Sequence, residues 1–300
     1  RAVLGSAKAS ALAFEEVRPD AKGDWLNLTS NDFEELVPLA SKSTKNATNE
    51  KGERAIFKLF GFGVSTKRDE WIYGDDRDSL LRKMQFLESR YSAQSAVAAP
   101  DATIKWSRNL KRRHEQGRRE KFDAVRLTRA AYRPYYSTWL YDSALFIDEL
   151  GIRDQLPEGD AAKQIVITDP TAQKPWLACA VQGVADLHFV GAAAGAVCLP
   201  FGRSTGKLVG DNITDWSLAE FRKHYQPGRG KKAQPITKEA IFHYVYAVLH
   251  DPLYREKYAQ NLKREFPRIP FYGDSETTFW QWAAWGERLW RQPLRWGIPA

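Results

Sequence analysis

The chain has 300 residues, of which 43% are hydrophobic, and this share excludes a wholly disordered polypeptide because it is enough for a packed core. The formal charge of +8 favours polyanionic partners, nucleic acid before an anionic membrane. No run approaches the ~20 apolar residues that a membrane-spanning helix needs, so we expect no membrane contact. The presence of only two cysteines fits a reducing compartment, and we expect a cytoplasmic location. Because the chain starts at Arg1 without an initiator Met, we expect it to be part of a longer protein.

The N-terminal part of the chain is predicted to mix helix and strand. An Ala-rich opening over 1–14 predicts a helix, and the polar stretch 40–54, which has no apolar period, predicts an exposed loop. Short apolar runs predict two strands, over 55–60 and 70–73. The glycines that follow the first of these runs predict a turn at 61–63.

A helix is predicted next, over 75–91, because apolar side chains recur there at helical spacing after a carboxylate that can cap the helix. These residues are Leu80, Leu81, Met84 and Leu87, preceded by Asp75 or Asp76. The small and polar stretch 92–103 predicts a connector.

Positive charge is concentrated in residues 105–121. Eight Lys or Arg stand there against two Glu, a net charge of +6, which leaves +2 for the rest of the chain. A solvated helix face and a phosphate-contacting surface both account for such a run, and its concentration gives the second interpretation equal weight.

The middle of the chain alternates short apolar runs with turns, and strands are predicted over 164–168, 176–181, 187–190 and 196–199. Cys179 and Cys198 lie in these runs without zinc-site spacing and are interpreted as small buried residues.

The C-terminal part is predicted to be helical, over 237–250, from Pro252 to about residue 266, and over 278–290. The last helix carries four tryptophans, which we interpret as core or as a docking face for other domains: Trp280, Trp282, Trp285 and Trp290. The predicted fold class is mixed α/β, with a strand-rich centre, C-terminal helices and a smaller mixed N-terminal part. The predicted division is 1–91, 92–124 and 125–300.

Catalytic motifs are missing from the sequence. The phrase at 169–172 lacks the second Pro and the aromatic residue of an amine-methylating loop. The segment 202–207 is one residue short of a phosphate-binding loop and has Leu208 in place of the magnesium-binding hydroxyl, so it predicts a basic turn. The five histidines are scattered and predict satisfied or surface side chains. We therefore expect no catalytic residue, metal or cofactor in this chain.

Several phrases, in order, resemble the single-polypeptide Type I (Type ISP) restriction–modification family. They are RPDAKGDWLN at 18–27, GVSTKRDEWIY at 63–73, AYRPYYSTWLY at 131–141, DLH at 186–188, and the segments 236–250, 254–258 and 267–270. Each phrase is weak alone, and the ordered set is specific. Two features depart from the family pattern, the pair Tyr135 and Tyr136 and the loop 40–54, so the DNA sequence that is recognised does not carry over.

The resemblance implies the C-terminal target-recognition part of an adenine-specific DNA methyltransferase and restriction enzyme. Its expected partners are duplex DNA and the methyltransferase and motor domains of the same polypeptide. S-adenosylmethionine, ATP and Mg are expected to act in the parent protein and not in this part.

Basic residues in four stretches are the candidates for DNA contact, since Lys and Arg bind phosphates and Arg also pairs with guanine. They are Lys67, Arg68, Arg108, Lys111, Arg112, Arg113, Arg118, Arg119, Arg203, Lys207, Arg229, Lys231 and Lys232. Ordinary solvated surface charge is the alternative for each loop.

Two other polar features receive a structural interpretation. Arg133, which lies among Tyr132, Pro134, Tyr135 and Tyr136, is expected to stack on aromatic rings and hold the fold rather than contact a base. Asp186 and His188 are expected to pair with each other or to cap a strand end.

Two other functions stay open. One is a degenerate DNA methyltransferase domain, which binding of S-adenosylmethionine by this chain would favour. The other is a coupling module that docks on the motor and methyltransferase domains without binding DNA.

Overall fold

The computed structural model describes residues 16–19, 23, 25, 31–95, 100–206, 208–226 and 234–296. The helices are α1 (Lys42–Asn46), α2 (Asp69–Ile72), α3 (Arg77–Ala93), α4 (Arg108–Glu115), α5 (Asp215–Tyr225), α6 (Lys238–Val248), α7 (Pro252–Lys257) and α8 (Glu276–Trp296). The strands are β1 (Val37–Pro38), β2 (Gly61–Phe62), β3 (Tyr73–Gly74), β4 (Leu127–Arg133), β5 (Tyr136–Tyr141), β6 (Lys163–Thr168), β7 (Ala178–Gln182), β8 (Val184–Ala185), β9 (Ala196–Pro200), β10 (Gly202–Thr205), β11 (Leu208–Asp211) and β12 (Arg268–Ile269).

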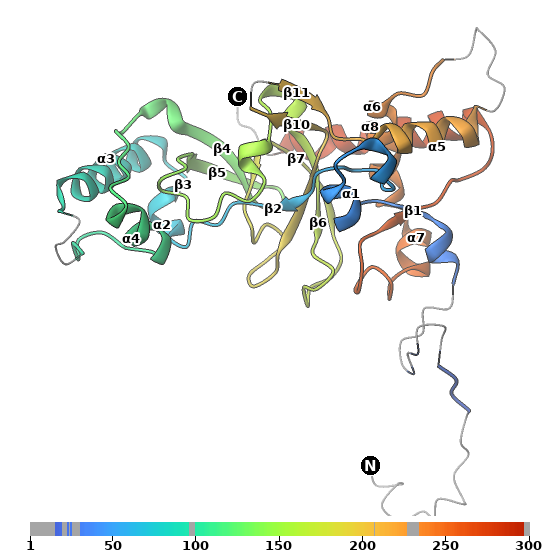
Figure 1. Ribbon diagram of the computed structural model, residues 1–300, viewed down its shortest axis with the longest axis horizontal. Helices are drawn as coiled ribbons and strands as arrows, with labels where there is room; N and C mark the ends of the chain where they lie inside the picture. The colour runs from blue at the N-terminus through green and yellow to red at the C-terminus, as the bar shows by residue number, and fades with distance from the viewer. Residues whose placement is uncertain are drawn as a thin grey trace, which may run out of the picture.

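A four-stranded antiparallel sheet, in the order β2-β9-β6-β7, lies at the centre of the molecule (Figure 1). Its side chains alternate between two buried faces, as strand geometry requires. Ile165 and Ile167 of β6 pack toward α6 and α8, whereas Val166 packs with Cys179 and Cys198 on the opposite face. Burial raises the pKa of these two thiols, to about 11 and about 12, so both stay protonated. The sequence interpretation of the cysteines as small buried residues is confirmed.

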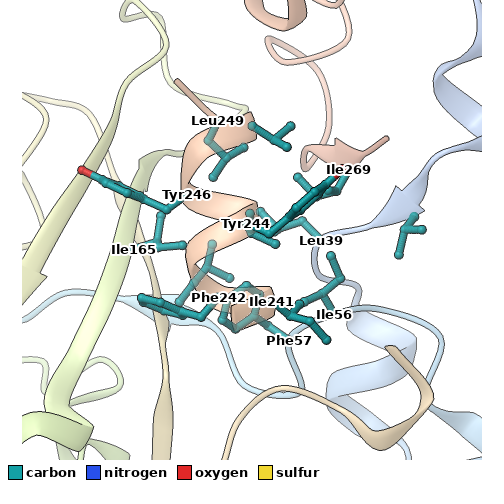
Figure 2. Close-up of a cluster of buried hydrophobic side chains, with 14 of the residues drawn as sticks. Leu39, Ile56, Phe57, Ile165, Ile241, Phe242, Tyr244, Tyr246, Leu249 and Ile269 are labelled. Atoms are coloured by element: carbon teal, nitrogen blue, oxygen red, sulfur yellow. The ribbon is translucent and has the colours of Figure 1, made fainter. Parts of the chain in front are cut away.

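Helix α6 is the centre of the largest hydrophobic cluster. The hydroxyl of Thr237 caps its first turn by accepting the N–H of Ala240 at 3.1 Å. Every residue from Ala240 to Val248 is buried, because the helix lies between the sheet, α8 and the N-terminal segment. Figure 2 shows its side chains directed on one side toward Ile165 of the sheet and on the other toward Leu39 and Ile56.

A smaller lobe has a hydrophobic cluster of its own, made by residues between Val64 and Ile147. Its sheet has the order β3-β5-β4-β8, in which β8 is parallel to β4 and the other pairs are antiparallel. Helices α2, α3 and α4 gather at this end of the molecule, away from α5, α6 and α8 (Figure 1). The predicted helix over 75–91 is confirmed as α3, and Asp76 is its cap.

The N-terminal segment that starts at residue 31 joins the large lobe. Val37 and Pro38 pair antiparallel with Ile269 and Arg268, and Gly61 pairs with Cys198. Phe33, Leu39, Ile56 and Phe57 enter the large cluster. Residues far apart in the chain therefore close the large lobe, whereas the small lobe uses nearly contiguous ones.

The predicted mixed α/β class, with a strand-rich centre and C-terminal helices, is confirmed. The division at 1–91, 92–124 and 125–300 stays a prediction, and the cluster of the small lobe contains residues from all three parts. In the described part of the chain, no helix is long and apolar enough to cross a membrane.

The prediction of a strand over 55–60 and a turn at 61–63 is wrong. Residues 55–60 form only isolated bridges through Phe57, and the paired strand is Gly61–Phe62. A Cβ on Gly61 would overlap the side chain of Ile152, and one on Gly63 would overlap the carbonyl oxygens of Ala185 and Asp186. These glycines therefore allow close packing of an extended chain and do not turn it.

Four other local predictions also fail. The predicted strand at 70–73 is the helical turn α2, whose first residues Asp69 and Glu70 suit a helix N-terminus. Residues 187–190 form a turn, in which the carboxylate of Asp186 accepts the backbone N–H of His188. The predicted loop 40–54 contains α1, and the helix that starts at Pro252 ends at Lys257. The predicted helix over 1–14 lies outside the described residues.

A buried histidine predicts a dependence of stability on pH. His243 of α6 is buried, and burial lowers its pKa to about 4, because the charged imidazolium would lose its hydration. The unfolded chain binds a proton near pH 6.5 and the folded chain does not. We therefore expect the free energy of unfolding to be unaffected above that pH and to fall by roughly 3 kcal/mol between pH 6.5 and 4.

Urea titrations across this pH range measure the effect. His243→Gln should flatten the dependence, and His224→Gln is the matched control, because it makes the same change at a half-buried histidine on α5. His250, whose pKa burial also lowers, contributes a residual slope of the same sign in both variants. An identical slope in wild type and His243→Gln would contradict the assignment.

Candidate nucleic-acid interface

Helix α4 displays most of the predicted basic segment. The hydroxyl of Ser107 caps the helix by accepting the N–H of Leu110 at 3.1 Å, and the carboxylate of Asp148 accepts bonds from Ser107 and Asn109. Leu110 and His114 face the small lobe. The opposite face is exposed and carries Arg108, Lys111 and Arg112, followed by Arg118 and Arg119. Within the described residues, no carboxylate pairs with Arg108, Lys111 or Arg112.

Two of the predicted DNA contacts lie inside the small lobe instead. Arg68 is 0% exposed and donates to the carbonyl oxygen of Phe146 at 2.5 Å. Arg113 is 8% exposed and donates to the carbonyl oxygens of Leu145, Ile147 and Asp148 at 2.7–3.0 Å. Burial lowers the pKa of Arg68 to about 10, which still leaves it charged at neutral pH. Both guanidinium groups hold the turn at 145–148 and are not accessible to a phosphate, which corrects the sequence interpretation.

The remaining predicted residues of the small lobe are exposed. Lys67 has φ 55° and lies 3.8 Å from a carboxylate oxygen of Glu149, a weak surface ion pair. The guanidinium of Arg119 stacks 5.2 Å from the centre of the Tyr91 ring and donates to the backbone carbonyl of Arg118 at 3.0 Å. Arg119 is therefore oriented by the protein, whereas the side chain of Arg118 makes no hydrogen bond or ion pair with the described residues.

The predicted basic turn at 202–207 is a two-stranded antiparallel ribbon formed by β10 and β11. Nε of Arg203 donates to the carbonyl oxygen of Asp211 at 3.1 Å across the ribbon. The predicted contacts Lys207, Arg229, Lys231 and Lys232 lie outside the described residues. The structure thus places Arg203 on a surface different from that of α4.

A cleft of about 920 Å³ separates the β4–β5 hairpin from β7 and residues 153–162. Four arginines line it, and each is engaged within the protein: Arg126, Arg129, Arg133 and Arg153. Arg153, for example, makes two 2.7 Å bonds to the carboxylate of Asp142. Four carboxylates also line the cleft, so its formal charge is balanced.

The stem of the β4–β5 hairpin is fixed by a buried polar network. The guanidinium of Arg133 lies 4.0 Å from the centre of the Tyr132 ring and 3.0 Å from the carboxylate of Asp186. Tyr73 donates to the second oxygen of that carboxylate, at 3.2 Å. The expected stacking of Arg133 on an aromatic ring is confirmed. Asp186 caps the turn that follows it and pairs with Arg133, not with the ring of His188.

The tip of the hairpin is a feature that the sequence did not reveal. Tyr135 has φ 61°, a left-handed conformation that costs a non-glycine residue about 1 kcal/mol or more, and it is 68% exposed at the cleft. The preceding Pro134 fixes the turn, but nothing in the sequence indicates the exposure. Among the described residues, no group of three or more His, Cys, Asp or Glu side chains is placed to hold a metal ion.

The sequence profile of the Type ISP C-terminal specificity domain family matches residues 55–294. The chain belongs to this family. No curated protein matches the chain. The matched region of this Type ISP specificity domain includes the small lobe, the cleft, the β10–β11 ribbon and the large lobe apart from its N-terminal segment 31–54.

Solved structures agree with the family. A cryo-EM structure of a DrdV–DNA complex is 34% identical, with a TM-score of 0.77 over 95% of this chain and 28% of that one. The Type ISP restriction–modification enzyme LlaGI, as a nuclease-deletion mutant with a DNA substrate mimic, is 22% identical, with a TM-score of 0.68 over 93% and 21%. The ATP-dependent Type ISP enzyme LlaBIII, bound to DNA, is 21% identical, with a TM-score of 0.71 over 92% and 17%. The last two show the fold alone, and this specificity domain spans less than a third of each of the three chains.

Proposed function

We propose that this domain recognises a specific sequence in duplex DNA for a larger restriction–modification enzyme that methylates adenine. The observation that carries the proposal is the 34% identity, over 95% of the chain, to DrdV in a DrdV–DNA complex. Membership of the specificity domain family supports it.

The exposed face of α4 supplies the positioning part of this function. Arg108, Lys111 and Arg112 project from a helix that Ser107, Asp148 and Arg113 anchor to the small lobe, and the exposed Arg118 follows the end of this helix. Cations on a rigid helix fix the register of a protein on the phosphate backbone and release counterions from the DNA. Sequence is then read by other side chains that reach base edges.

Charge reversal at Arg112 of α4 and at Arg118, just after the helix, tests the positioning role. For Arg112→Glu/Arg118→Glu we expect the affinity for random duplex DNA at 50 mM salt to fall about tenfold or more. The slope of log affinity against log salt should become shallower by about 2, because two phosphate contacts are lost. Fluorescence anisotropy across a salt series measures both quantities.

A matched control is Lys51→Glu/Lys223→Glu, which changes the net charge by the same amount at two exposed sites on the large lobe. This control should bind nearly as the wild type does. Equal losses in the two double variants would mean that only the overall charge matters, and an unchanged affinity of the α4 variant would remove α4 from the interface.

The proposal assigns catalysis and its cofactors to other domains of a cytoplasmic parent enzyme. S-adenosylmethionine, ATP and Mg²⁺ would bind there, which is supported by the small share of the DrdV chain, 28%, that this domain covers. Isothermal titration with S-adenosylmethionine separates the alternatives, because binding by this chain would favour a degenerate methyltransferase instead.

Contact with the other domains has its own candidate surface. A groove between α8 and the turn that joins α6 to α7 is lined by Trp282, Trp285 and His250, and Trp285 is 46% exposed. An exposed aromatic groove of this kind favours docking. We therefore propose that the methyltransferase and motor domains of the same polypeptide are the partners, in addition to DNA.

A further inference from the structure

The β10–β11 ribbon exposes apolar side chains that no part of the described chain covers. Leu208 is 74% exposed and Val209 is 60% exposed, although both belong to a paired strand. In an antiparallel pair, residues opposite each other share a face, so Leu208 lies with Thr205 on one face and Val209 with Ser204 on the other. The two sides of the ribbon are therefore both open to solvent.

The ribbon is isolated but firmly rooted. It forms a separate two-stranded sheet, and such hairpins are only marginally stable in water by themselves. Its root is held by Asn212, which is fully buried and donates from Nδ2 to the carbonyl oxygens of Leu59 and Pro200 at 2.8 Å. Its oxygen accepts the N–H of Leu59 at 2.6 Å. Gly202, where the ribbon begins, packs against Pro157 and Ala161. A rigid root with a projecting tip is suited to positioning side chains on a partner.

The dimensions and chemistry of the ribbon fit the DNA major groove. That groove, about 12 Å wide, admits a two-stranded β-ribbon. Its floor offers guanine acceptors to arginine, other polar edges to serine and threonine, and thymine methyl groups to apolar side chains. The ribbon carries a side chain for each of these groups. Arg203 suits guanine, Ser204 and Thr205 suit other polar base edges, and Leu208 and Val209 suit thymine methyl groups. Arg203 is partly oriented, because its Nε is bound to the carbonyl oxygen of Asp211.

We propose that the β10–β11 ribbon enters the major groove and determines part of the recognised sequence, with Leu208 and Val209 on thymine methyl groups and Arg203 on guanine. The inference rests on the proposed DNA recognition and names the element that performs it. The ribbon is separate from α4, whose cations act on phosphates (Figure 1).

The experiment is selection of bound sequences from a pool of randomised duplex DNA, with the wild type and the variants Leu208→Ala, Val209→Ala and Arg203→Ala. We expect each variant to lose its preference at one or two base pairs and to bind the wild-type site about five- to a hundredfold more weakly. Affinity for random duplex DNA should fall much less than affinity for the wild-type site for Leu208→Ala and Val209→Ala, because apolar side chains release no counterions, and somewhat more for Arg203→Ala, which removes one positive charge. Leu253→Ala is the matched control, because Leu253 on α7 is also 74% exposed.

Base analogues then test the individual contacts. Replacing the affected thymine by uracil removes only its methyl group and should weaken binding by the wild type about three- to fivefold, the value of one buried carbon. The same replacement should have no effect on the matching alanine variant, because the contact is already lost.

The results distinguish a failure of the ribbon inference from a failure of the proposed DNA recognition. Variants that keep the wild-type site and affinity, or that weaken binding to all sequences equally, overturn the ribbon as the element that reads bases. A wild-type chain that selects no sequence and does not bind DNA at low salt overturns the proposed DNA recognition, and the ribbon inference with it. Circular dichroism of each variant shows that the fold is retained.

Discussion

Replacing Arg113 with alanine is expected to lower the free energy of unfolding by about 3–5 kcal/mol, the usual cost of removing one member of a buried charged group. Three backbone carbonyl oxygens of the turn at 145–148 would lose the guanidinium donor at once, and only that of Asp148 would keep another among the described residues, Nδ2 of Asn109. The buried carboxylate of Asp148 would also lose a nearby positive charge. Because this turn holds the N-terminus of α4 through Ser107, the small lobe should lose its packing first.

Arg112→Ala is the matched control, since it removes an arginine from the preceding position of the same helix, where the side chain is exposed. Chemical denaturation should show a change of less than about 0.5 kcal/mol for this variant. The contrast also has a functional readout, because Arg112→Ala should weaken DNA binding while preserving the fold. Equal stabilities of the two variants would show that the buried bonds of Arg113 contribute nothing.

Gly286→Ala is expected to destabilise the large lobe by about 2–4 kcal/mol. Alanine is favoured over glycine within a helix by about 1 kcal/mol, so the direction depends on the packing. A Cβ at position 286 of α8 would overlap the carbonyl group of His243 in α6 and press on the backbone nitrogen of Ala247. Backbone atoms cannot rotate away, and the two helices would have to separate over their whole contact. The overlap therefore outweighs the gain in helix propensity.

Thermal unfolding of this variant should show a midpoint several degrees below that of the wild type. Gly210→Ala is the control, because a Cβ there has no neighbour within 4 Å. If Gly286→Ala proved as stable as the wild type, the close approach of α6 and α8 would be incorrect.

Helices α3, α6 and α8 and the central strands β6, β7 and β9 were predictable because their apolar spacing is strong and agrees with their tertiary environment. Residues 75–91 have a buried stripe that matches the face packed in the small lobe. The run at 164–168 has a continuous apolar centre at 165–167, as expected for a strand that is buried on both faces.

The failed local predictions have a common physical cause, which is contact with residues distant in the sequence. Gly61 and Gly63 resemble turn residues until Ile152, Ala185 and Asp186 are known to lie against them. The burial of Arg113 depends on carbonyl groups more than 30 residues away, although its spacing from Leu110 places it on the inner face of α4. Such partners leave no signal in the local pattern.

Only part of the candidate interface could be predicted, again because contacts with distant residues decide which basic side chains are buried. The concentration of charge at 105–121 identified the α4 surface correctly as exposed for Arg108, Lys111, Arg112, Arg118 and Arg119. It could not separate Arg113 from these, since all are cations in one run. The segment 202–207 predicted only a basic turn, and the exposure of Leu208 and Val209 appears only in the structure, where their two-stranded ribbon pairs with no other strand of the described chain.

The pairing of Val37 with Ile269 has a consequence for synthesis of the protein. At roughly 5–20 residues per second, a ribosome needs about 10–50 s between these two positions. During that interval the small lobe can already fold, because its core lies almost entirely within residues 64–147. Phe33, Leu39 and Ile56 must wait for α6 and β12, and their apolar surface is open to chaperones until then.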